Sequence, residues 1–319
     1  MRRVTGWAAT TLMVVAGTVM VWVGAPGAQA PQQPAASGQP QSEPPQTGPA
    51  APAGQPGAQA AAPRRFTGPP PAPKKKVLVV GMTLGWHHDS VSDAMATIWK
   101  LGRESNAFDV EIRTDVEWIT KKPLKPVRRN LNDFDAIVFA STTGELPLTE
   151  DQKADFLSFI RDDGKGFVGV HAALDTNYKW PEYGEMIGGY FDGHPWNTFD
   201  APVIVEDPTF PAMRHFAPVL TLHDEMYQAK TWSRDKVNVL MRLDETKLDY
   251  TGKNRLREDR DFAITWSKMY GKGRVFYSSL GHTREAWQDP DIQKMYLEAI
   301  KWVLGRTEGS TTPHPRPRT

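Results

Sequence analysis

The sequence predicts an α/β fold with a parallel sheet and helices on both of its faces. Short uninterrupted apolar runs, each bounded by charged or turn residues, are typical of strands that are buried on both faces of such a sheet. Segments with the helical spacing of apolar residues lie between these runs. This alternation of strand and helix is the pattern from which doubly wound parallel sheets are built.

The expected strands and helices can be placed in order along the chain. Thr149 and Gln152 form a capping box that marks the start of one helix, and Gly164 follows the end of that helix. Apolar residues at helical spacing define the first and last helices. The expected strands are 76–82, 108–113, 135–140, 166–170, 237–243, 262–266 and 274–278, and the expected helices are 90–104, 149–161 and 289–304.

The segment from about 178 to 231 has a different composition from the rest of the domain. It is rich in aromatic residues, proline and glycine, and its strand-like pieces are short. Such a composition is typical of loops and turns. We therefore expect one α/β domain with a loop-rich insertion, rather than two domains.

Residues 1–30 have the three parts of an export signal. Arg2 and Arg3 give a positive start, residues 7–23 form an uncharged and mostly apolar run, and a small-x-small cleavage site ends at Ala30. The sequence therefore predicts a signal peptide and a periplasmic or secreted protein, with no stable membrane span after cleavage. The apolar run is slightly long for a cleaved signal, so an uncleaved membrane anchor is the alternative.

Residues 31–74 have the composition of a disordered linker. They contain 13 of the 27 prolines and almost no apolar aromatic or β-branched residues, so they cannot bury enough surface to fold. The Pro-rich segment 307–319 predicts a disordered tail for the same reason. The folded domain is then 75–306, and residues 74–307 carry 32 basic and 35 acidic side chains, a net charge of −3.

Composition and motifs exclude several classes of protein. The chain of 319 residues has 38 basic and 37 acidic side chains, and this balance argues against a nucleic-acid partner, which needs a basic surface. The absence of cysteine excludes disulfides, zinc fingers and thiol catalysis. Residues 164–169 match G-x-G-x-x-G, but they precede a strand, whereas a dinucleotide-binding motif follows one.

Histidines gather where the predicted strands end. His88 follows the first strand, His171 ends a central strand, and His282 follows the last buried strand. Ligands of open parallel sheets bind outside the carboxyl ends of the strands, so we expect these imidazoles to lie at one edge of the sheet. His194 lies in a loop that can fold over the same edge. These four histidines are the expected site residues.

Two carboxylates could join this site. Asp89 either caps the helix that starts near Ser90 or belongs to the site, and the two roles can coexist. Glu225 belongs to the acid pair of an Asp-Glu-Met-Tyr motif, which could act as acid/base or orient a sugar, with a surface pair as the alternative. Imidazoles and carboxylates can transfer protons or bind a first-row metal, and the spacing does not choose between these functions.

Several short motifs occur in a fixed order over most of the domain. They include Trp-His-His-Asp-Ser at 86–90, Gly-Phe-Val-Gly-Val-His-Ala-Ala at 166–173 and Phe-Asp-Gly-His-Pro-Trp at 191–196. Further motifs lie at 134–138, 148–152, 180–183, 205–208, 224–227, 271–277 and 280–282. From about Val77 to Leu304, the chain resembles the ThuA family, the trehalose-utilisation domain.

The ThuA family resembles class I glutamine amidotransferases in fold. This resemblance implies a flavodoxin-like parallel sheet. In those amidotransferases, a cysteine nucleophile lies on the sharp turn after a central strand, and His171 occupies that position here. A chain without cysteine cannot hydrolyse glutamine by the thiol route, and the fold alone does not supply another function.

The resemblance also implies a carbohydrate-related function. ThuA relatives occur in sugar catabolism, near oxidoreductases that make 3-keto sugars. We therefore expect an enzyme that acts on a keto-glycoside or disaccharide by hydrolysis, elimination or isomerisation, with histidine-based acid/base or metal-assisted catalysis. The alternative is a sugar-binding or scaffold protein without catalysis.

The residues expected in this site have three roles. His171, Asp89 and Glu225 are the candidates for catalysis. His171, His194 and His282 are the candidates for binding a divalent metal, zinc or another first-row ion, which is the one cofactor that the pattern suggests. The candidates for substrate contact are Trp86, His88, Trp180, Trp196 and Tyr227. Core packing is the alternative for the aromatic residues among them.

Overall fold

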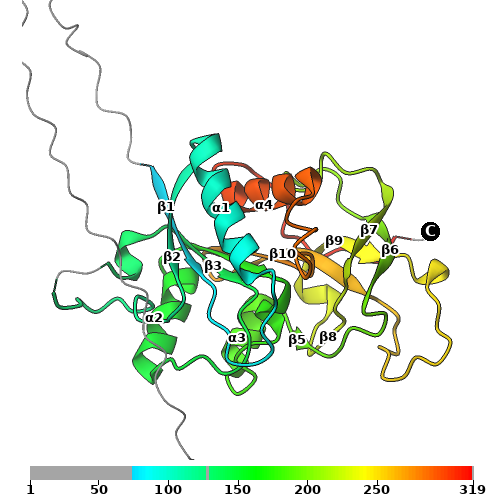
Figure 1. Ribbon diagram of the computed structural model, residues 1–319, viewed down its shortest axis with the longest axis horizontal. Coiled ribbons are helices and arrows are strands. Elements are labelled where there is room, and N and C mark those ends of the chain that lie inside the picture. The colour runs from blue at the N-terminus through cyan, green and yellow to red at the C-terminus, as the bar shows by residue number, and fades with distance from the viewer. Residues whose placement is uncertain (1–73, 127–128, 318–319) are drawn as a thin grey trace, which may run out of the picture. The chain divides into compact units, whose positions relative to one another are not determined.

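The computed structural model describes residues 74–126 and 129–317 (Figure 1). The predicted signal peptide 1–30 and nearly all of the predicted linker 31–74 therefore lie outside the described residues. The strands are β1 (Lys75–Val80), β2 (Phe108–Arg113), β3 (Ala136–Ala140), β4 (Gly166–Val170), β5 (Tyr190–Phe191), β6 (Thr198–Val205), β7 (Val219–Glu225), β8 (Ala229–Lys230), β9 (Asn238–Leu243), β10 (Ala263–Tyr270) and β11 (Gly273–Ser278). The α-helices are α1 (Val91–Ser105), α2 (Glu150–Arg161), α3 (Pro181–Ile187) and α4 (Pro290–Val303).

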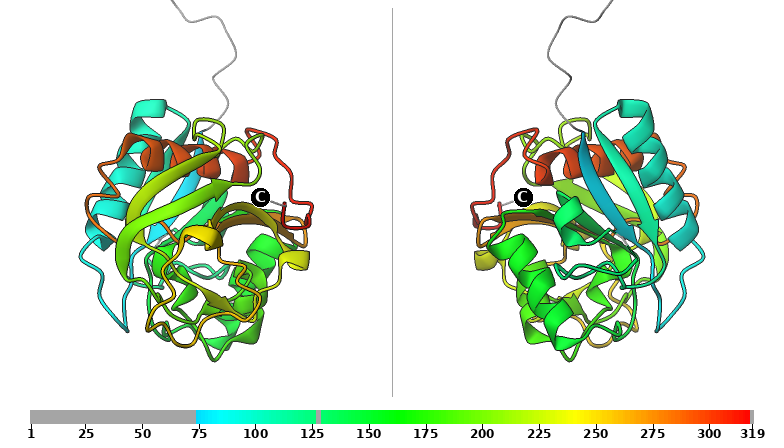
Figure 2. Two further views of the ribbon diagram at one scale, coloured as in Figure 1. Left: turned by 90° about the vertical axis from the view of Figure 1, so that its right-hand side faces the viewer. Right: turned by 90° about the vertical axis from the view of Figure 1, so that its left-hand side faces the viewer.

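A nine-stranded mixed sheet with the order β2-β1-β3-β4-β11-β10-β9-β6-β7 forms the centre of the domain. The first five of these strands are parallel. With β11 as the fifth parallel strand along the chain, they have the 2-1-3-4-5 order of flavodoxin-like folds. Helices α1 and α4 pack together on one face of the sheet, and α2 and α3 lie on the other (Figure 1 and Figure 2). The predicted α/β, flavodoxin-like architecture is therefore confirmed.

The first strand supplies side chains to both faces of the sheet. Val77 and Val79 belong to the hydrophobic core under α1 and α4, whereas Leu78 and Val80 belong to the core under α2 and α3. All four side chains are fully buried. Neighbouring residues of a strand point to opposite faces, which explains why a strand covered on both sides is apolar at every position.

The sequence predicted a loop-rich insertion over 178–231, but this segment also contributes strands to the main sheet. It contains β6 and β7, which pair antiparallel with each other, and β6 continues the sheet beyond β9. Strands β9 and β10 are also antiparallel, so this half of the sheet differs from the parallel half. Buried and less buried residues alternate along β6, and this gives a weaker sequence signal than a fully apolar strand.

The C-terminal segment 307–317 packs against the domain, so the prediction of a disordered tail is wrong. The carbonyl group of Ser310 accepts hydrogen bonds from Asn238 at 2.9 Å and from Ser267 at 3.0 Å. Both donors lie on strands of the sheet and are buried. The tail is therefore held through its backbone, which its composition does not reveal.

None of the helices in the described part of the chain has the length and apolar character that a membrane span needs.

Removal of residues 308–319 is expected to lower the free energy of unfolding by roughly 2 kcal/mol, because Asn238 and Ser267 lose their shared acceptor. Urea denaturation of the shortened chain measures this change. Ser267→Ala in the complete chain removes one of the two hydrogen bonds to Ser310 and should cost about half as much. An unchanged denaturation midpoint in the shortened chain would show that the tail does not stabilise the domain.

Candidate functional site

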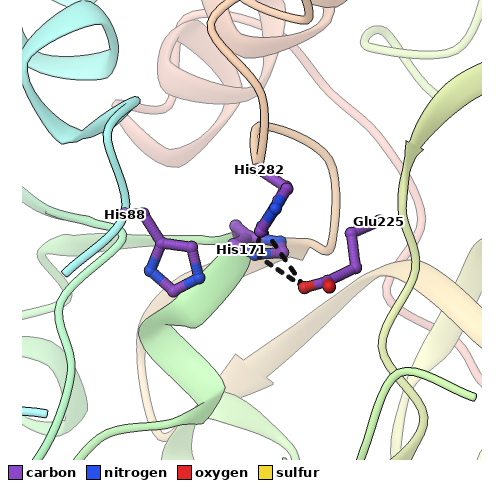
Figure 3. Close-up of side chains that lie close together, drawn as sticks. All are labelled: His88, His171, Glu225 and His282. Carbon is purple, nitrogen blue, oxygen red and sulfur yellow. Dashed lines mark hydrogen bonds and ion pairs between the residues drawn. The ribbon is translucent and has the colours of Figure 1, made fainter. Parts of the chain in front are cut away.

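Three of the predicted histidines and one predicted carboxylate meet at the carboxyl edge of the parallel strands (Figure 3). His88 follows β1, His171 follows β4, His282 follows β11, and Glu225 is the last residue of β7. One nitrogen or oxygen atom from each of these side chains lies within 4.8 Å of the others. We call these four residues the donor cluster.

His171 lies on a sharp turn between β4 and a short 3-10 helix, His171–Leu174. Its φ angle is 42°, in the left-handed region that side chains other than glycine rarely adopt. Nδ1 of His171 lies 2.6 Å from the carbonyl oxygen of Ser279, which can only accept a hydrogen bond, so Nδ1 carries the proton. The other nitrogen, Nε2, therefore presents a lone pair to the donor cluster.

The carboxylate of Glu225 lies among imidazole nitrogens. Its Oε2 is 3.6 Å from His171 Nε2 and 3.2 Å from His282 Nδ1, and its Oε1 is 3.3 Å from His194 Nδ1. Within the described residues, all of its ion-pair partners are histidines. His282 Nδ1 also lies 3.1 Å from His171 Nε2. The lone pairs of Glu225 and His171 thus converge on one point beside Nδ1 of His282.

Burial changes the pKa values of the donor cluster. Burial and neighbouring histidines lower the pKa of His88 to about 4. Burial also lowers the pKa of His282, and it holds the pKa of the fully buried His171 well below its usual range. The same desolvation raises the pKa of Glu225, which His194 partly opposes. Neutral imidazoles offer lone pairs to a cation, and a cation would offset the cost of burying the carboxylate.

These features fit a divalent first-row metal. Imidazoles with a carboxylate are a ligand set that zinc and related metals prefer. His88 has a buried Nδ1 without a hydrogen-bond partner. The hydrogen bond to Ser279 fixes the ring of His171, as hydrogen bonds from outside the ligand shell do in known metal sites. The donor cluster could therefore hold a metal through His88, His171, Glu225 and His282.

His194, which the sequence proposed as a metal ligand, is not part of the donor cluster. Its side chain is 41% exposed, and Nδ1 lies 3.0 Å from Asn197 Oδ1 as well as close to Glu225. Two acceptors at Nδ1 keep the proton there, so Nε2 carries the lone pair. His88, which was expected to contact substrate, takes the fourth position of the cluster.

A cavity of about 460 Å³ opens above the donor cluster, and we call it the aromatic chamber. This volume lies in the range of small-molecule binding sites. The ring centroid of Tyr227 lies 4.2 Å from the ring centroid of His171 and 4.3 Å from that of Phe191. The residues that line the chamber are Trp86, His88, Asp175, Phe191, His194, Glu225, Tyr227 and His282. His171 lies fully buried beneath them, out of direct reach of a substrate.

Trp180 and Trp196 do not line the chamber, so the expectation that they stack on a sugar is not met. Trp180 is 5% exposed and packs against Phe156 and Tyr183. Trp196 is 8% exposed and packs edge-on against Phe262. Both indole rings fill the hydrophobic core, which was the alternative for these residues.

Asp89 also lies outside the aromatic chamber. Its side chain is exposed, and Ser90 occupies the N-cap position of α1. Asp89 therefore neither caps α1 nor belongs to the donor cluster. Asp89 borders a neighbouring hollow, which is described below.

A second carboxylate, Asp224, could be predicted only in part from the sequence. Its side chain is fully buried and accepts hydrogen bonds from the backbone N–H groups of Gly281 at 2.6 Å, His282 at 3.3 Å and Thr283 at 3.2 Å. Adjacent residues of a strand point to opposite sides, so Glu225 faces the chamber while Asp224 fixes the loop that carries His282. The sequence showed Asp224 and Glu225 as an acid pair, but it did not predict that the two carboxylates have different roles.

Other residues of the site carried no signal in the sequence. The carbonyl group of Ser279 accepts a hydrogen bond from the ring N–H of His171. Oγ of Ser279 accepts a hydrogen bond of 2.8 Å from the backbone N–H of Tyr227. Phe191 and Asp175 also line the chamber, although neither was among the site residues expected from the sequence. Such contacts depend on how distant segments meet, which local patterns do not encode.

The fold and the donor cluster define a flavodoxin-like α/β protein with a buried His/Glu site at the carboxyl edge of its sheet. The ThuA family, described as trehalose utilisation, matches residues 76–303. The chain therefore belongs to the ThuA family, and this membership indicates a carbohydrate-related function.

Solved structures of two other proteins have a similar fold. A putative ThuA-like protein from Bacteroides uniformis is 23% identical, with a TM-score of 0.57, over 75% of this chain and 95% of that one. A putative ThuA-like protein from Parabacteroides merdae is 17% identical, with a TM-score of 0.56, over 77% of this chain and 94% of that one. At these identities the likeness shows the fold alone. No curated protein matches the sequence significantly.

Proposed function

We propose that this protein is an exported enzyme that cleaves keto-glycosides by metal-assisted elimination. The observation that carries this proposal is the convergence of His88, His171, Glu225 and His282 at one side of an aromatic-lined chamber. Membership of the ThuA family supports a sugar substrate. The signal-like sequence of residues 1–30 supports export to the periplasm or secretion.

His194 is the proton acceptor in this proposal. It lines the chamber and is partly exposed, and Glu225 and Asn197 hold its proton on Nδ1, so Nε2 is free to accept another. His171 is fully buried and suits a metal ligand better than a base that touches substrate. The rings of Trp86, Phe191 and Tyr227 provide the apolar surface against which a sugar ring can lie.

The reaction follows from the acidity of a C–H bond next to a ketone. In a 3-keto glycoside, His194 removes the proton from C2, the C–H electron pair forms the C1–C2 double bond, and the bond from C1 to the leaving oxygen breaks. The proton then passes from His194 to the leaving oxygen. The products are an unsaturated keto sugar and an alcohol, with no change in oxidation state. A divalent metal in the donor cluster would supply positive charge near the developing enolate oxygen.

Elemental analysis and a panel of 3-keto glycosides test this proposal together. We expect about one divalent metal per chain, and turnover of keto-glycosides but not of the parent glycosides. His194→Ala should lower kcat by about 10²–10⁴-fold and keep the metal, whereas His171→Ala should lose the metal. His223→Ala is the matched control, because His223 is exposed on β7 and pairs with Asp200 outside the chamber.

The outcomes separate the proposed enzyme from its rivals. Wild-type turnover in His194→Ala would contradict the assignment of the base. Wild-type turnover in His171→Ala and after treatment with a chelator would contradict metal assistance. Sugar binding without turnover of any keto-glycoside would instead support a sugar-binding protein, and the absence of both would support a scaffold.

A further inference from the structure

A second hollow meets the aromatic chamber at the donor cluster. It has a volume of about 400 Å³ and shares Trp86, His88 and His282 with the chamber. We call it the polar arm, because charged and polar side chains form the rest of its lining. These residues are His87, Asp89, Thr283, Arg284 and Glu285. The two hollows are therefore neighbours that meet at Trp86, His88 and His282.

The two walls of the polar arm are tied to each other. Ser90 Oγ donates a hydrogen bond of 2.9 Å to the carbonyl group of Gly281, which links the start of α1 to the loop after β11. Asp224 holds the same loop from beneath through backbone N–H groups. The loop that carries Arg284 is therefore held against the segment that carries Asp89. The polar arm is thus a built feature of the fold and not a gap between free loops.

Trp86 stands at the junction of the two hollows. Its side chain is 73% exposed, although its backbone is anchored. The carbonyl group of Trp86 and the N–H group of Gly85 both bond to Oγ1 of Thr143, at 2.9 Å and 3.1 Å. Because Trp86 lines both hollows, its exposed indole ring is available to a ligand in either of them.

We propose that the polar arm is a second sugar-binding subsite, which holds the leaving-group sugar of a keto-disaccharide while the keto ring occupies the aromatic chamber. This proposal rests on the proposed function. The shared residues His88 and His282 place the scissile bond where the two hollows meet. Hydroxyl groups can donate to Asp89 and Glu285 and accept from Arg284. The two carboxylates would repel an anionic leaving group, so a neutral sugar fits best.

A pair of substrates with the same keto ring tests this subsite. One is a 3-keto disaccharide and the other is the methyl 3-keto glycoside, which lacks the second ring. Asp89→Ala and Glu285→Ala should each lower the ratio of their kcat/KM values about fivefold, the loss of one hydrogen bond. Phe191→Ala, in the aromatic chamber, should lower both kcat/KM values together. Arg103→Ala, on α1 outside both hollows, is the control.

Calorimetric binding of the unoxidised disaccharide and methyl glycoside separates this subsite from the proposed reaction. If the arm variants weaken disaccharide binding selectively but no substrate is turned over, the second subsite stands and the elimination fails. If turnover is measured and the kcat/KM ratio does not change in either arm variant, the subsite is overturned. The subsite is equally overturned if neither turnover nor binding depends on the second ring.

Discussion

Glu225→Gln is expected to weaken metal binding by at least about 100-fold while the fold stays stable. In known metal sites, loss of a residue that only supports a ligand already lowers metal affinity 10–100-fold. Glu225 is itself a ligand candidate and is the one carboxylate of the donor cluster. Burial raises the pKa of this carboxylate, so the apoprotein should not be destabilised by its neutral replacement. Titration with zinc, followed by calorimetry and by the melting temperature, measures both effects.

The matched control for this experiment is Glu150→Gln on α2. Glu150 is 89% exposed and pairs with Lys153, so its replacement should change neither metal affinity nor stability. Zinc should raise the melting temperature of the wild-type protein and of Glu150→Gln, but not that of Glu225→Gln. Wild-type zinc affinity in Glu225→Gln would show that the metal is not held in the donor cluster.

Glu206→Ala is expected to lower the free energy of unfolding by about 3–5 kcal/mol. The side chain of Glu206 is shielded from solvent and pairs with Arg234 at 2.7 Å and with Arg242 at 2.8 Å. Arg242 is only 1% exposed, and loss of Glu206 leaves its buried guanidinium with the more exposed Glu245 as its remaining ion-pair partner among the described residues. For a domain of this size the melting temperature should fall by roughly 10 °C.

Thermal and denaturant unfolding measure this loss against an exposed ion pair. Glu308 pairs with Arg274 at 2.8 Å but is 84% exposed, so Glu308→Ala should cost less than about 1 kcal/mol. The double variant Glu206→Ala, Arg242→Ala should lose less than the sum of the two single variants, because neither charge is left alone. A loss at Glu206 no larger than that at Glu308 would contradict the buried-network argument.

The parallel strands of this fold could be predicted because a strand that is buried on both faces appears in the sequence as an uninterrupted apolar run. The bounds of β2 and β4 agree with the predicted strands 108–113 and 166–170. Strand β6 lies in the segment where only short strand-like pieces were expected, since one of its faces is less buried and it contains Pro202. The C-terminal tail was assigned to disorder because its anchors are side chains of other segments that bind its backbone.

The donor cluster could be predicted in part, for a reason of topology. Parallel strands end at one edge of a sheet, so histidines after β1, β4 and β11 had to lie near each other. The choice between His88 and His194 depends on contacts between distant segments, such as those of His88 with Tyr227 and of His194 with Glu225. The burial of Trp180 could not be predicted, because an aromatic residue near a turn suits either a core or a site.

The donor cluster draws on both halves of the sheet. His88, His171 and His282 follow strands of the parallel half, whereas Glu225 ends β7, the last strand of the antiparallel half. A metal bound there would act as a cross-link between these halves, and its binding free energy would resist unfolding of the whole domain rather than of one loop. In a chain without cysteine, such a cross-link would take the place of a disulfide, and removal of the metal by a chelator, rather than reduction, would release it.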